Sequence, residues 1–264
     1  MNPIKSIMPK LMEDIDLTIV ESENVFNYLV SGKASEVEMA AFLATLSVKG
    51  SCSKELIGAV NALKPFVKNP LELDISTIDI VGTGGDGLKT YNISTAVAFI
   101  VASNGLYVAK HGNTAVSSKS GASDVLKELG INININKEII NKCLKETNMC
   151  FLFAPNYNNA FKYVAKVRKE LSFRTIFNLL GPLLNPVRAK RQLLGVFSNQ
   201  YLKVLAETLQ AQNSIKSWVV NGSDGMDEIT LTGITKVVEL AKNQIKEFEI
   251  NPEKYNFKLC SPES

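Results

Sequence analysis

Five short runs rich in β-branched and aromatic residues alternate with amphipathic segments from about residue 74 onward. The runs are IDIV (78–81), LYVA (106–109), CFLFA (150–154), LLGVF (193–197) and SWVV (217–220). Segments with helical spacing of apolar residues lie between and after them, at 94–104, 123–129, 137–147, 159–170 and 200–211. Regular alternation of strand and helix is typical of a parallel sheet covered by helices. We therefore predict an α/β region with a central, mainly parallel sheet flanked by helices.

The first 73 residues follow a different pattern. VFNYLV (25–30), EMAAFLATLSV (38–48) and ELIGAVNALKPFV (55–67) repeat apolar residues at three- and four-residue spacing, which is typical of helices. Ser35, with Glu38 three residues later, matches a capping box. We predict a small all-helical domain over residues 1–73 and a larger α/β domain over residues 74–264.

Composition excludes several classes of protein. The chain has 264 residues, 45% of them hydrophobic, and can bury a substantial core. Its 29 basic and 26 acidic side chains are scattered, which gives no nucleic-acid footprint. It has neither a secretory leader at its start nor an apolar run of about 18 residues, so we expect a cytoplasmic protein and no membrane contact. Four dispersed cysteines and one histidine disfavour a zinc site or a disulfide framework.

The segment GTGGDGLKTYNIST (82–95) follows the first predicted strand. Its glycines expose backbone N–H groups where a strand runs into a helix, and a chain without Cβ atoms can wrap closely around phosphate oxygens. Asn92, Ser94 and Thr95 add side-chain donors and acceptors at the start of the next helix. Taken alone, the glycines can also form a purely structural turn, and Ser94 can simply cap its helix.

Further polar loops follow the later strands. KHGN (110–113) supplies a cation, an imidazole and an amide; Lys110 could balance phosphate charge, whereas an isolated His111 is more typical of a structural hydrogen-bonding group. SSKSGASDVLKELG (117–130) opens a helix for which we predict Ser123 as the cap.

The loop DGMDE (224–228) carries adjacent acids, Asp227 and Glu228, after the strand SWVV. Such a pair can hold a hard divalent cation that also touches phosphate oxygens, or it can simply be solvated. Because parallel sheets bind ligands at the carboxyl ends of their strands, we expect these loops to form one site.

With these residues assembled, the chain resembles the anthranilate phosphoribosyltransferase family. The resemblance runs through most of the chain, in family order, over GTGGD (82–86), NIST (92–95), KHGN (110–113), SSKSG (117–121), SDVLKELG (123–130), VRKEL (167–171), RTIFNLLGPLLNP (174–186) and DGMDE (224–228). It implies transfer of a 5-phosphoribosyl group from phosphoribosyl pyrophosphate to the amino group of anthranilate, in tryptophan biosynthesis.

The same resemblance implies a helical domain that forms a homodimer, completed by residues of about 168–188, and an active site in the cleft between the domains. It also implies a further C-terminal segment, which this sequence, ending in NFKLCSPES, does not contain.

The resemblance also assigns roles to individual residues. Two magnesium ions are implied, one held by Ser94 and Glu228 and the other by Asp227 and Glu228. Anthranilate would contact Gly82, Asn113 and Arg168, with Gly181 and His111 nearby. No general base is assignable. Phosphoribosyl pyrophosphate would be held by Gly82, Gly85, Asp86, Thr90, Asn92, Ser94, Thr95, Lys110, His111, Gly112, Asn113, Ser117 and Ser118.

Four departures from the family pattern involve six residues. Thr114 and Ala115 stand where Arg-Ser is common, Ala122 replaces a serine, Asn158 replaces a histidine near anthranilate, and Ser172-Phe173 replaces Gly-Ile. These departures affect individual contacts and leave the phosphate and metal motifs intact.

Two other functions compete with this hypothesis. A pyrimidine nucleoside phosphorylase would carry K-H-S-T-G-G, with glycines after the lysine, whereas here GTGGD precedes KHGN by a strand and a helix. A catalytically silent homologue that binds nucleic acid would have eroded metal and phosphate motifs and a concentrated basic face.

Overall fold

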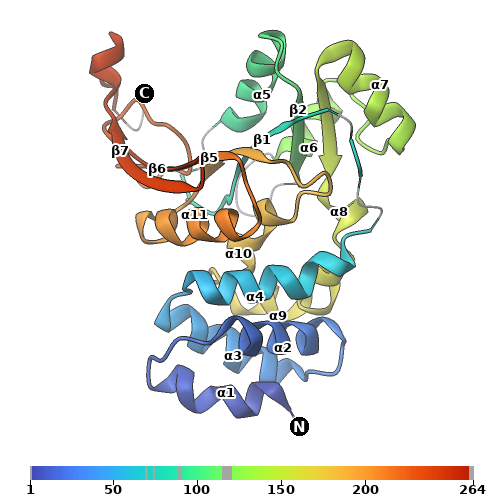
Figure 1. Ribbon diagram of the computed structural model, residues 1–264, viewed down its shortest axis with the longest axis vertical. Helices are drawn as coiled ribbons and strands as arrows, with labels where there is room; N and C mark the ends of the chain where they lie inside the picture. Colours follow the sequence, from blue (N-terminus) through green and yellow to red (C-terminus); the bar gives the residue numbers. More distant parts are fainter. Residues whose placement is uncertain (1, 69–70, 74, 89–90, 115–120, 262–264) are drawn as a thin grey trace.

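The computed structural model describes residues 2–68, 71–73, 75–88, 91–114 and 121–261 (Figure 1). A bundle of helices forms one end of the molecule, and a sheet with its covering helices forms the other. This arrangement confirms the predicted fold class. Among the described residues, no helix is long and apolar enough to cross a membrane.

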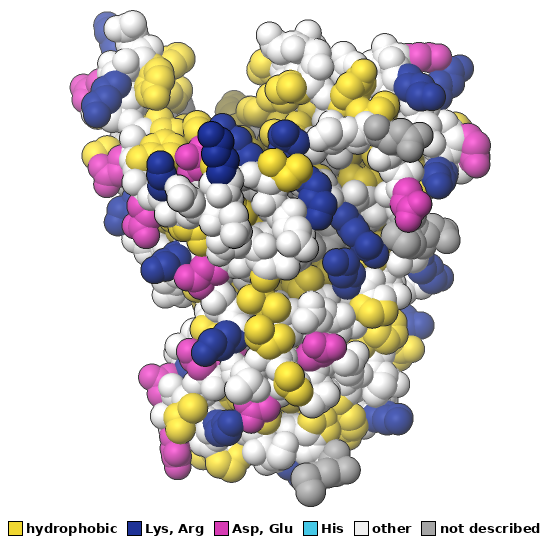
Figure 2. Space-filling view, viewed as in Figure 1, with side chains coloured by type: hydrophobic (Ala, Val, Ile, Leu, Met, Phe, Trp, Pro, Cys, Tyr) yellow, Lys and Arg dark blue, Asp and Glu magenta, His cyan; other side chains and the backbone are white. Residues whose placement is uncertain are grey.

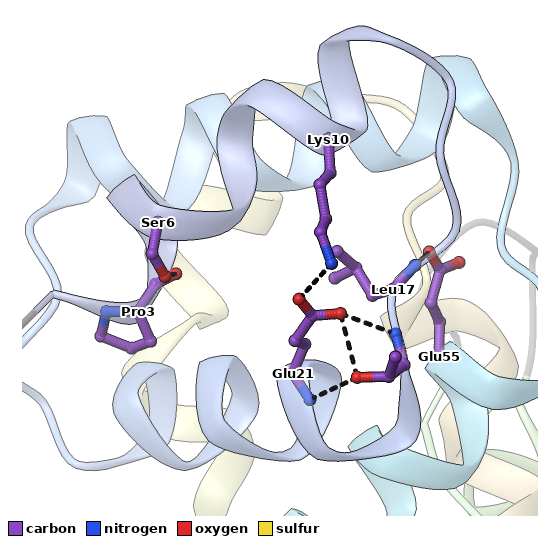
Figure 3. Close-up of polar contacts among 7 residues, drawn as sticks. Pro3, Ser6, Lys10, Leu17, Glu21 and Glu55 are labelled. Atoms are coloured by element: carbon purple, nitrogen blue, oxygen red, sulfur yellow. Dashed lines mark hydrogen bonds and ion pairs between the residues drawn. The ribbon is translucent and has the colours of Figure 1, made fainter.

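The N-terminal bundle follows the predicted helical pattern. Its helices are α1 (Pro3–Met12), α2 (Ile19–Val30), α3 (Glu36–Lys49) and α4 (Ser53–Leu63), followed by the 3-10 turn η1 (Lys64–Phe66). Ser35 is the N-cap of α3 and forms the predicted capping box with Glu38. Thr18 and Glu21 form a second box at the start of α2, where Lys10 Nζ also lies 2.5 Å from Glu21 Oε1 (Figure 3). Local sequence signals therefore decide where these helices begin.

A later stretch of the chain packs back against the bundle. It comprises α8 (Ala154–Tyr157), η2 (Asn159–Tyr163), α9 (Ala165–Leu171), α10 (Phe177–Leu180) and η3 (Gly181–Leu184). The ring of Phe177 lies 5.5 Å from that of Phe26, which in turn lies 5.8 Å from that of Phe42. The single helix predicted over 159–170 is in fact interrupted at Val164.

The sheet has seven strands in the order β3-β2-β1-β4-β5-β6-β7. Five strands are parallel, as predicted, and the last two are antiparallel. Their bounds are β1 (Ile78–Gly82), β2 (Val108–Gly112), β3 (Met149–Phe153), β4 (Arg191–Gly195), β5 (Lys216–Gly222), β6 (Thr235–Ala241) and β7 (Gln244–Ile250).

Helices cover both faces of the parallel part. They are α5 (Ile93–Ser103), α6 (Ala122–Glu128), α7 (Lys137–Thr147) and, after the 3-10 turn η4 (Asn199–Tyr201), α11 (Leu202–Ala211); η5 (Pro252–Tyr255) follows the last strand. Helix α11 lies between the sheet and α4 (Figure 1). Apolar residues of α4, α11 and β4–β6 consequently share one hydrophobic core with the bundle.

Two predictions about the strands need correction. The second strand does not end at Ala109: it runs from Val108 to Gly112, so Lys110 and His111 are strand residues rather than loop residues. The hairpin β6–β7 was not predicted, because its sequences, TKVVELA and QIKEFEI, interleave charges with apolar residues and one strand is largely exposed. Its turn is marked by Lys242 and Asn243, both at positive φ.

Candidate active site

The carboxyl ends of β1 and β4 form the floor of the candidate site. Gly82 ends β1 and pairs with Gly195 at the end of β4. A Cβ atom on Gly82 would lie 2.3 Å from Oδ2 of Asp227, and one on Gly195 would lie 1.5 Å from the backbone O of Asp227. Both strands must therefore end in glycine for the loop that carries Asp227 to cross them. The sequence analysis missed Gly195, although it follows an apolar strand just as Gly82 does.

Two distant loops of the sequence meet above this floor. The backbone N–H of Gly84 donates to Asp227 Oδ2 at 2.7 Å, and the hydroxyl of Ser94 donates to Glu228 Oε1. Gly84 and Gly85 have φ angles of 65° and 78°, which glycine adopts without strain. Hydrogen bonds thus join the glycine turn (residues 82–87) and the start of the following helix to the acidic loop (residues 224–228).

The carboxylates of this structure are buried close to one another. Burial, together with the neighbouring charge of Asp86, raises the pKa of Asp227 to about 6. Burial likewise raises the pKa of Glu228 to about 7, against the hydrogen bond from Ser94. A cation would relieve this cost, and a donor set made only of oxygens suits Mg²⁺.

Helix α5 begins beside these acids. Asn92 is its N-cap and accepts a hydrogen bond from Thr95 N at 3.3 Å, so Ser94 is not the cap and its hydroxyl reaches Glu228 instead. Thr95 is buried, and its Oγ1 has no hydrogen-bond partner among the described residues.

Helix α6 begins in a similar way, and the prediction that Ser123 caps it is wrong. The N-cap is Gly121, whose N–H donates to Asp124 Oδ2 at 2.8 Å. Ser123 lies inside the first turn, fully buried, and its hydroxyl has no partner in the described part of the chain. Buried hydroxyls without partners at the starts of two helices are available to a polar ligand.

Lys110 does not extend into open space. Its Nζ donates to the backbone O of Ile80 at 2.6 Å, and its side chain is buried. Burial lowers its pKa, while the carboxylates of Asp79, Glu228 and Asp227 act in the opposite direction. Lys110 therefore places a positive charge beneath the acidic pair.

His111 is held as a neutral side chain. Burial lowers its pKa to about 4, against a hydrogen bond to the backbone of Gly181. Its Nε2 also lies 3.2 Å from Nδ2 of Asn158. The imidazole ring is therefore held by contacts to both Gly181 and Asn158. Asn158, which replaces a histidine of the family pattern, keeps its buried Oδ1 without a partner among the described residues.

A buried carboxylate that the sequence analysis missed, Asp79, positions these residues from below. Asp79 Oδ1 accepts a hydrogen bond from His111 N at 3.0 Å, and its Oδ2 accepts one from Asn185 Nδ2 at 2.8 Å. Asp79 lies inside the predicted strand 78–81, and an acid flanked by apolar residues there was the available signal.

Arg168 projects from α9 onto two aromatic rings. Its guanidinium lies 5.4 Å from the centre of Phe177 and 6.0 Å from that of Phe161. Burial lowers its pKa, and no acid lies within ion-pair distance among the described residues. A half-buried cation without a counter-charge favours binding of an anion.

The end of β2 approaches α6 closely. A Cβ atom on Gly112 would lie 2.8 Å from the ring of Phe151 and 3.1 Å from the Cβ of Ala122, so the strand needs glycine there. Asn113 Oδ1 accepts a hydrogen bond from Thr114 N at 2.8 Å. Three of the residues assigned to phosphoribosyl pyrophosphate, Thr90, Ser117 and Ser118, lie outside the described residues, as does Ala115.

The helical bundle contains a second group of potential metal ligands, Asp16, Cys52 and Glu55. The ammonium of Lys49 occupies this group, 2.5 Å from Asp16 Oδ1 and 3.2 Å from Glu55 Oε1. A side-chain cation already balances these carboxylates, so the cluster is structural.

Cations also gather at the opposite edge of the sheet. Lys64, Arg188 and Lys190 line a cavity of about 40 Å³. Burial lowers the pKa of Lys64, and the charges of Arg188 and Lys190 lower it further. Figure 2 shows Lys and Arg side chains that run across the α/β part down to its junction with the bundle, with acidic side chains beside some of them. This cluster is separate from the acids at the carboxyl edge, which is about 13 Å away along a five-residue strand.

Comparison with known proteins identifies relatives for both parts of the chain. Residues 74–264 match the model described as glycosyl transferase family, a/b domain, and residues 5–65 match the helical bundle domain of the same family. An anthranilate phosphoribosyltransferase of Bradyrhizobium sp. (strain BTAi1) is 45% identical over 98% of this chain and 77% of its own length. One from Rhodopseudomonas palustris (strain BisB18) is 47% identical over 96% of this chain and 74% of its own length.

Solved structures agree with these relatives. Anthranilate phosphoribosyltransferase from Thermus thermophilus superimposes with a TM-score of 0.88 at 37% identity, over 100% of this chain and 77% of that one. The Saccharomyces cerevisiae enzyme, in a complex with phosphoribosyl pyrophosphate and Mg, gives a TM-score of 0.86 at 28% identity, over 98% of this chain and 76% of that one. From its sequence, its fold and these relatives, the chain belongs to the anthranilate phosphoribosyltransferase family.

Proposed function

We propose that this protein transfers the 5-phosphoribosyl group from phosphoribosyl pyrophosphate to the amino nitrogen of anthranilate, a step of tryptophan biosynthesis. The products are N-(5-phosphoribosyl)anthranilate and pyrophosphate. The observation that carries the proposal is the joining of the glycine turn to the acidic loop through the Gly84–Asp227 and Ser94–Glu228 hydrogen bonds. Solved relatives from yeast hold phosphoribosyl pyrophosphate with Mg, or 4-fluoroanthranilate.

The phosphoribosyl donor would lie over the glycine turn and the starts of α5 and α6. Backbone N–H groups at a helix start favour anions, and the unpartnered hydroxyls of Thr95 and Ser123 supply further polar contacts. The remaining residues assigned to this ligand, from Gly82 to Asp86 and from Asn92 to Asn113, surround the same strand ends.

Two magnesium ions fit the acidic residues above the floor. Ser94 and Glu228 would hold one, and Asp227 with Glu228 the other. Bound there, Mg²⁺ would neutralise charge on the pyrophosphate leaving group. Lys110 is buried close enough to interact with the same carboxylates, whose charges favour its protonated form.

Anthranilate would be held by its carboxylate. Arg168 supplies a guanidinium that has no counter-charge in the described part of the chain, and its planar fork of N–H donors matches a carboxylate. Gly82, Asn113, Gly181 and His111 would complete the surroundings of the aromatic ring and its amino group.

In the reaction, the bond between C1 of the ribose and the pyrophosphate oxygen breaks, the bond between C1 and the anthranilate nitrogen forms, and that nitrogen then loses a proton. His111 is a poor candidate for the base. Its pKa is about 4, and its ring is already bonded to Asn158 and Gly181. The residues around the site therefore act by positioning the two substrates and stabilising charge.

We also propose that the protein is a cytoplasmic homodimer formed through its helical bundle. Val20, Val37 and Val48 are 66%, 78% and 90% exposed on α2 and α3, which supports an apolar contact surface there. Light scattering on the purified protein tests the dimer, and a monomer at micromolar concentration would contradict it.

The activity itself is tested by fluorescence. Purified protein with Mg²⁺ should quench anthranilate fluorescence only when phosphoribosyl pyrophosphate is present, and should release pyrophosphate in equal amount. Release of pyrophosphate without anthranilate, or no turnover of anthranilate, would contradict the proposal. Retention on nucleic acid in place of turnover would favour the silent homologue, and phosphorolysis of uridine would favour the nucleoside phosphorylase.

A further inference from the structure

The segment RTIFN (174–178) joins the two parts of the molecule and has no role in the function proposed above. Its start lies against the helical bundle: the hydroxyl of Ser47 in α3, which donates to Leu43 O at 2.7 Å, also lies 3.2 Å from the backbone O of Arg174. Within the segment, Thr175 N donates to Asn178 Oδ1 at 3.0 Å. These contacts fix the backbone from which the Arg174 and Asn178 side chains project.

The side chain of Arg174 extends from this anchor toward the carboxyl end of β4. Its guanidinium lies 4.6 Å from the ring centre of Phe197, two residues beyond that strand. Phe197 is itself held in place, since its N–H donates to Thr83 Oγ1 at 3.3 Å and its ring packs on Tyr201. Stacking on a fixed ring orients the plane of the guanidinium.

The same side chain borders the glycine turn. A Cβ atom at Gly85 would lie 3.6 Å from Arg174 Nε, 3.9 Å from Arg174 Cδ and 3.9 Å from Asn178 Nδ2. A guanidinium edge and a side-chain amide therefore face a stretch of backbone that presents no side chain of its own. Two kinds of N–H donor and an open peptide surface lie within reach of one ligand.

Neither donor has an acidic or hydrogen-bonding partner in the described part of the chain. Arg174 has no acid within ion-pair distance, and Asn178 Nδ2 has no hydrogen-bond partner, among the residues that the structure describes. Asp227, one of the residues that would bind metal, accepts a hydrogen bond from Gly84 N in the same turn, and the charge of Asp86 acts on it. A ligand that contacts both the metal and these donors must be strongly anionic.

We infer that Arg174 and Asn178 bind the pyrophosphate group of the donor substrate over the Gly84–Gly85 turn. The inference rests on the proposed function and adds Arg174 and Asn178 to the residues that would bind the phosphate groups. Phosphate oxygens accept from a guanidinium fork, from an amide and from the backbone at once, and glycine lets them approach closely. Because Ser47 of α3 lies against the backbone of Arg174, this contact also links bound pyrophosphate to the helical bundle.

Three substitutions test the contact. Arg174→Met keeps an apolar stem over Phe197 and removes the charge, Arg174→Lys keeps the charge without the planar fork, and Asn178→Asp keeps the acceptor for Thr175 N while replacing the donor. Arg188→Ala is the matched control: an exposed arginine of the same domain at the opposite edge of the sheet.

We expect Arg174→Met to raise the KM for phosphoribosyl pyrophosphate about 10- to 100-fold, the range for loss of a charged hydrogen bond. Arg174→Lys should give a smaller increase, and Asn178→Asp should weaken binding through repulsion. The KM for anthranilate and the thermal midpoint should stay unchanged in the arginine variants. Inhibition by inorganic pyrophosphate should weaken by the same factor as the KM rises, while inhibition by ribose 5-phosphate should not change.

Calorimetry can compare the affinity of the wild type and of Arg174→Met for Mg²⁺-pyrophosphate. This measurement tests the inference without requiring the enzyme to turn over. Equal affinity of the two proteins overturns it, even if the wild type is fully active. Conversely, weaker binding by the variant supports the pyrophosphate contact even if the wild type does not turn over anthranilate, which would refute only the proposed function. Weakened inhibition by ribose 5-phosphate alone would move Arg174 to the other phosphate and also overturn the inference.

Discussion

The helical bundle and the α/β part each bury a lysine among carboxylates, and the two clusters differ in how completely their polar atoms are paired. In the bundle, Glu55 accepts hydrogen bonds from Leu17 N and Cys52 N and forms an ion pair with Lys49. Burial works against the Lys49 ammonium, but its hydrogen bond to Asp16 and the charge of Glu55 outweigh this and raise its pKa. Each partner in this cluster stabilises the charge of another.

At the strand ends the balance is different. Lys110 lies below Asp227 and Glu228, yet burial still raises the pKa of both carboxyls, to about 6 and about 7. The described buried atoms without hydrogen bonds, on Thr95, Ser123, Asn158 and Thr175, all lie outside the N-terminal bundle. A cluster that satisfies itself is structural, whereas one left with excess charge and unused hydroxyls is built to receive a ligand.

The largest expected effect comes from removing the excess charge. Asp227→Asn with Glu228→Gln should reduce turnover by about 10³-fold or more, because the magnesium ligands are lost. The free energy of unfolding should stay the same or rise, since both carboxyls are costly to ionise where they lie. Steady-state rates and urea denaturation measure the two quantities. Surviving activity would show that the metal assignment is wrong.

The same kind of change in the bundle should have the opposite result. Glu55→Gln leaves one backbone N–H without its acceptor and Lys49 with one carboxylate fewer, which should lower the free energy of unfolding by about 3–5 kcal/mol. The KM values of the folded protein should not change. Glu38→Gln, in an exposed capping box, is the control and should have a much smaller effect, because glutamine can also accept in such a box. Equal losses in the two variants would remove the distinction between the clusters.

Arg168 extends the comparison to a cation that has no acidic partner among the described residues. Arg168→Ala should raise the KM for anthranilate about 10- to 100-fold, because the carboxylate loses its counter-charge, and should leave the KM for phosphoribosyl pyrophosphate nearly unchanged. Lys162→Ala, which removes a cation stacked on Tyr163 in the same region, is the control. An unchanged KM for anthranilate would exclude the carboxylate contact.

The sequence predicts features that depend on local spacing better than features that depend on contacts between distant residues. The Ser35–Glu38 box and the five parallel strands follow from local spacing, and the acids and glycines of the site from their position at strand ends. The direction of the Lys110 side chain depends on β2 continuing to Gly112, and the place of Asp79 depends on Asn185, which is distant in sequence. Such pairings are decided by tertiary packing. The same holds for Ser123, which was predicted as a helix cap but is buried without a hydrogen-bond partner among the described residues.

A last expected effect concerns pH and magnesium together. Because burial raises the pKa values of Asp227 and Glu228, the folded protein binds more protons than the unfolded chain between about pH 4 and pH 7. Their contribution to stability is therefore greatest at low pH and is lost as the pH rises through the folded pKa values. Without metal, the free energy of unfolding should fall by on the order of 5 kcal/mol across this window from these two groups together.

Magnesium should reverse this loss at pH 7.5, where the carboxylates are charged, and should have little effect at pH 5, where protons compete for the same oxygens. Thermal unfolding with EDTA or with Mg²⁺ at each pH measures both effects. The variant with Asp227→Asn and Glu228→Gln should lose both the extra pH dependence and the response to Mg²⁺. Glu55→Gln should keep both, although its unfolding midpoint is lower at every pH. If the doubly substituted protein still responds to Mg²⁺ as the wild type does, the ion binds elsewhere and the two clusters no longer differ in the way proposed.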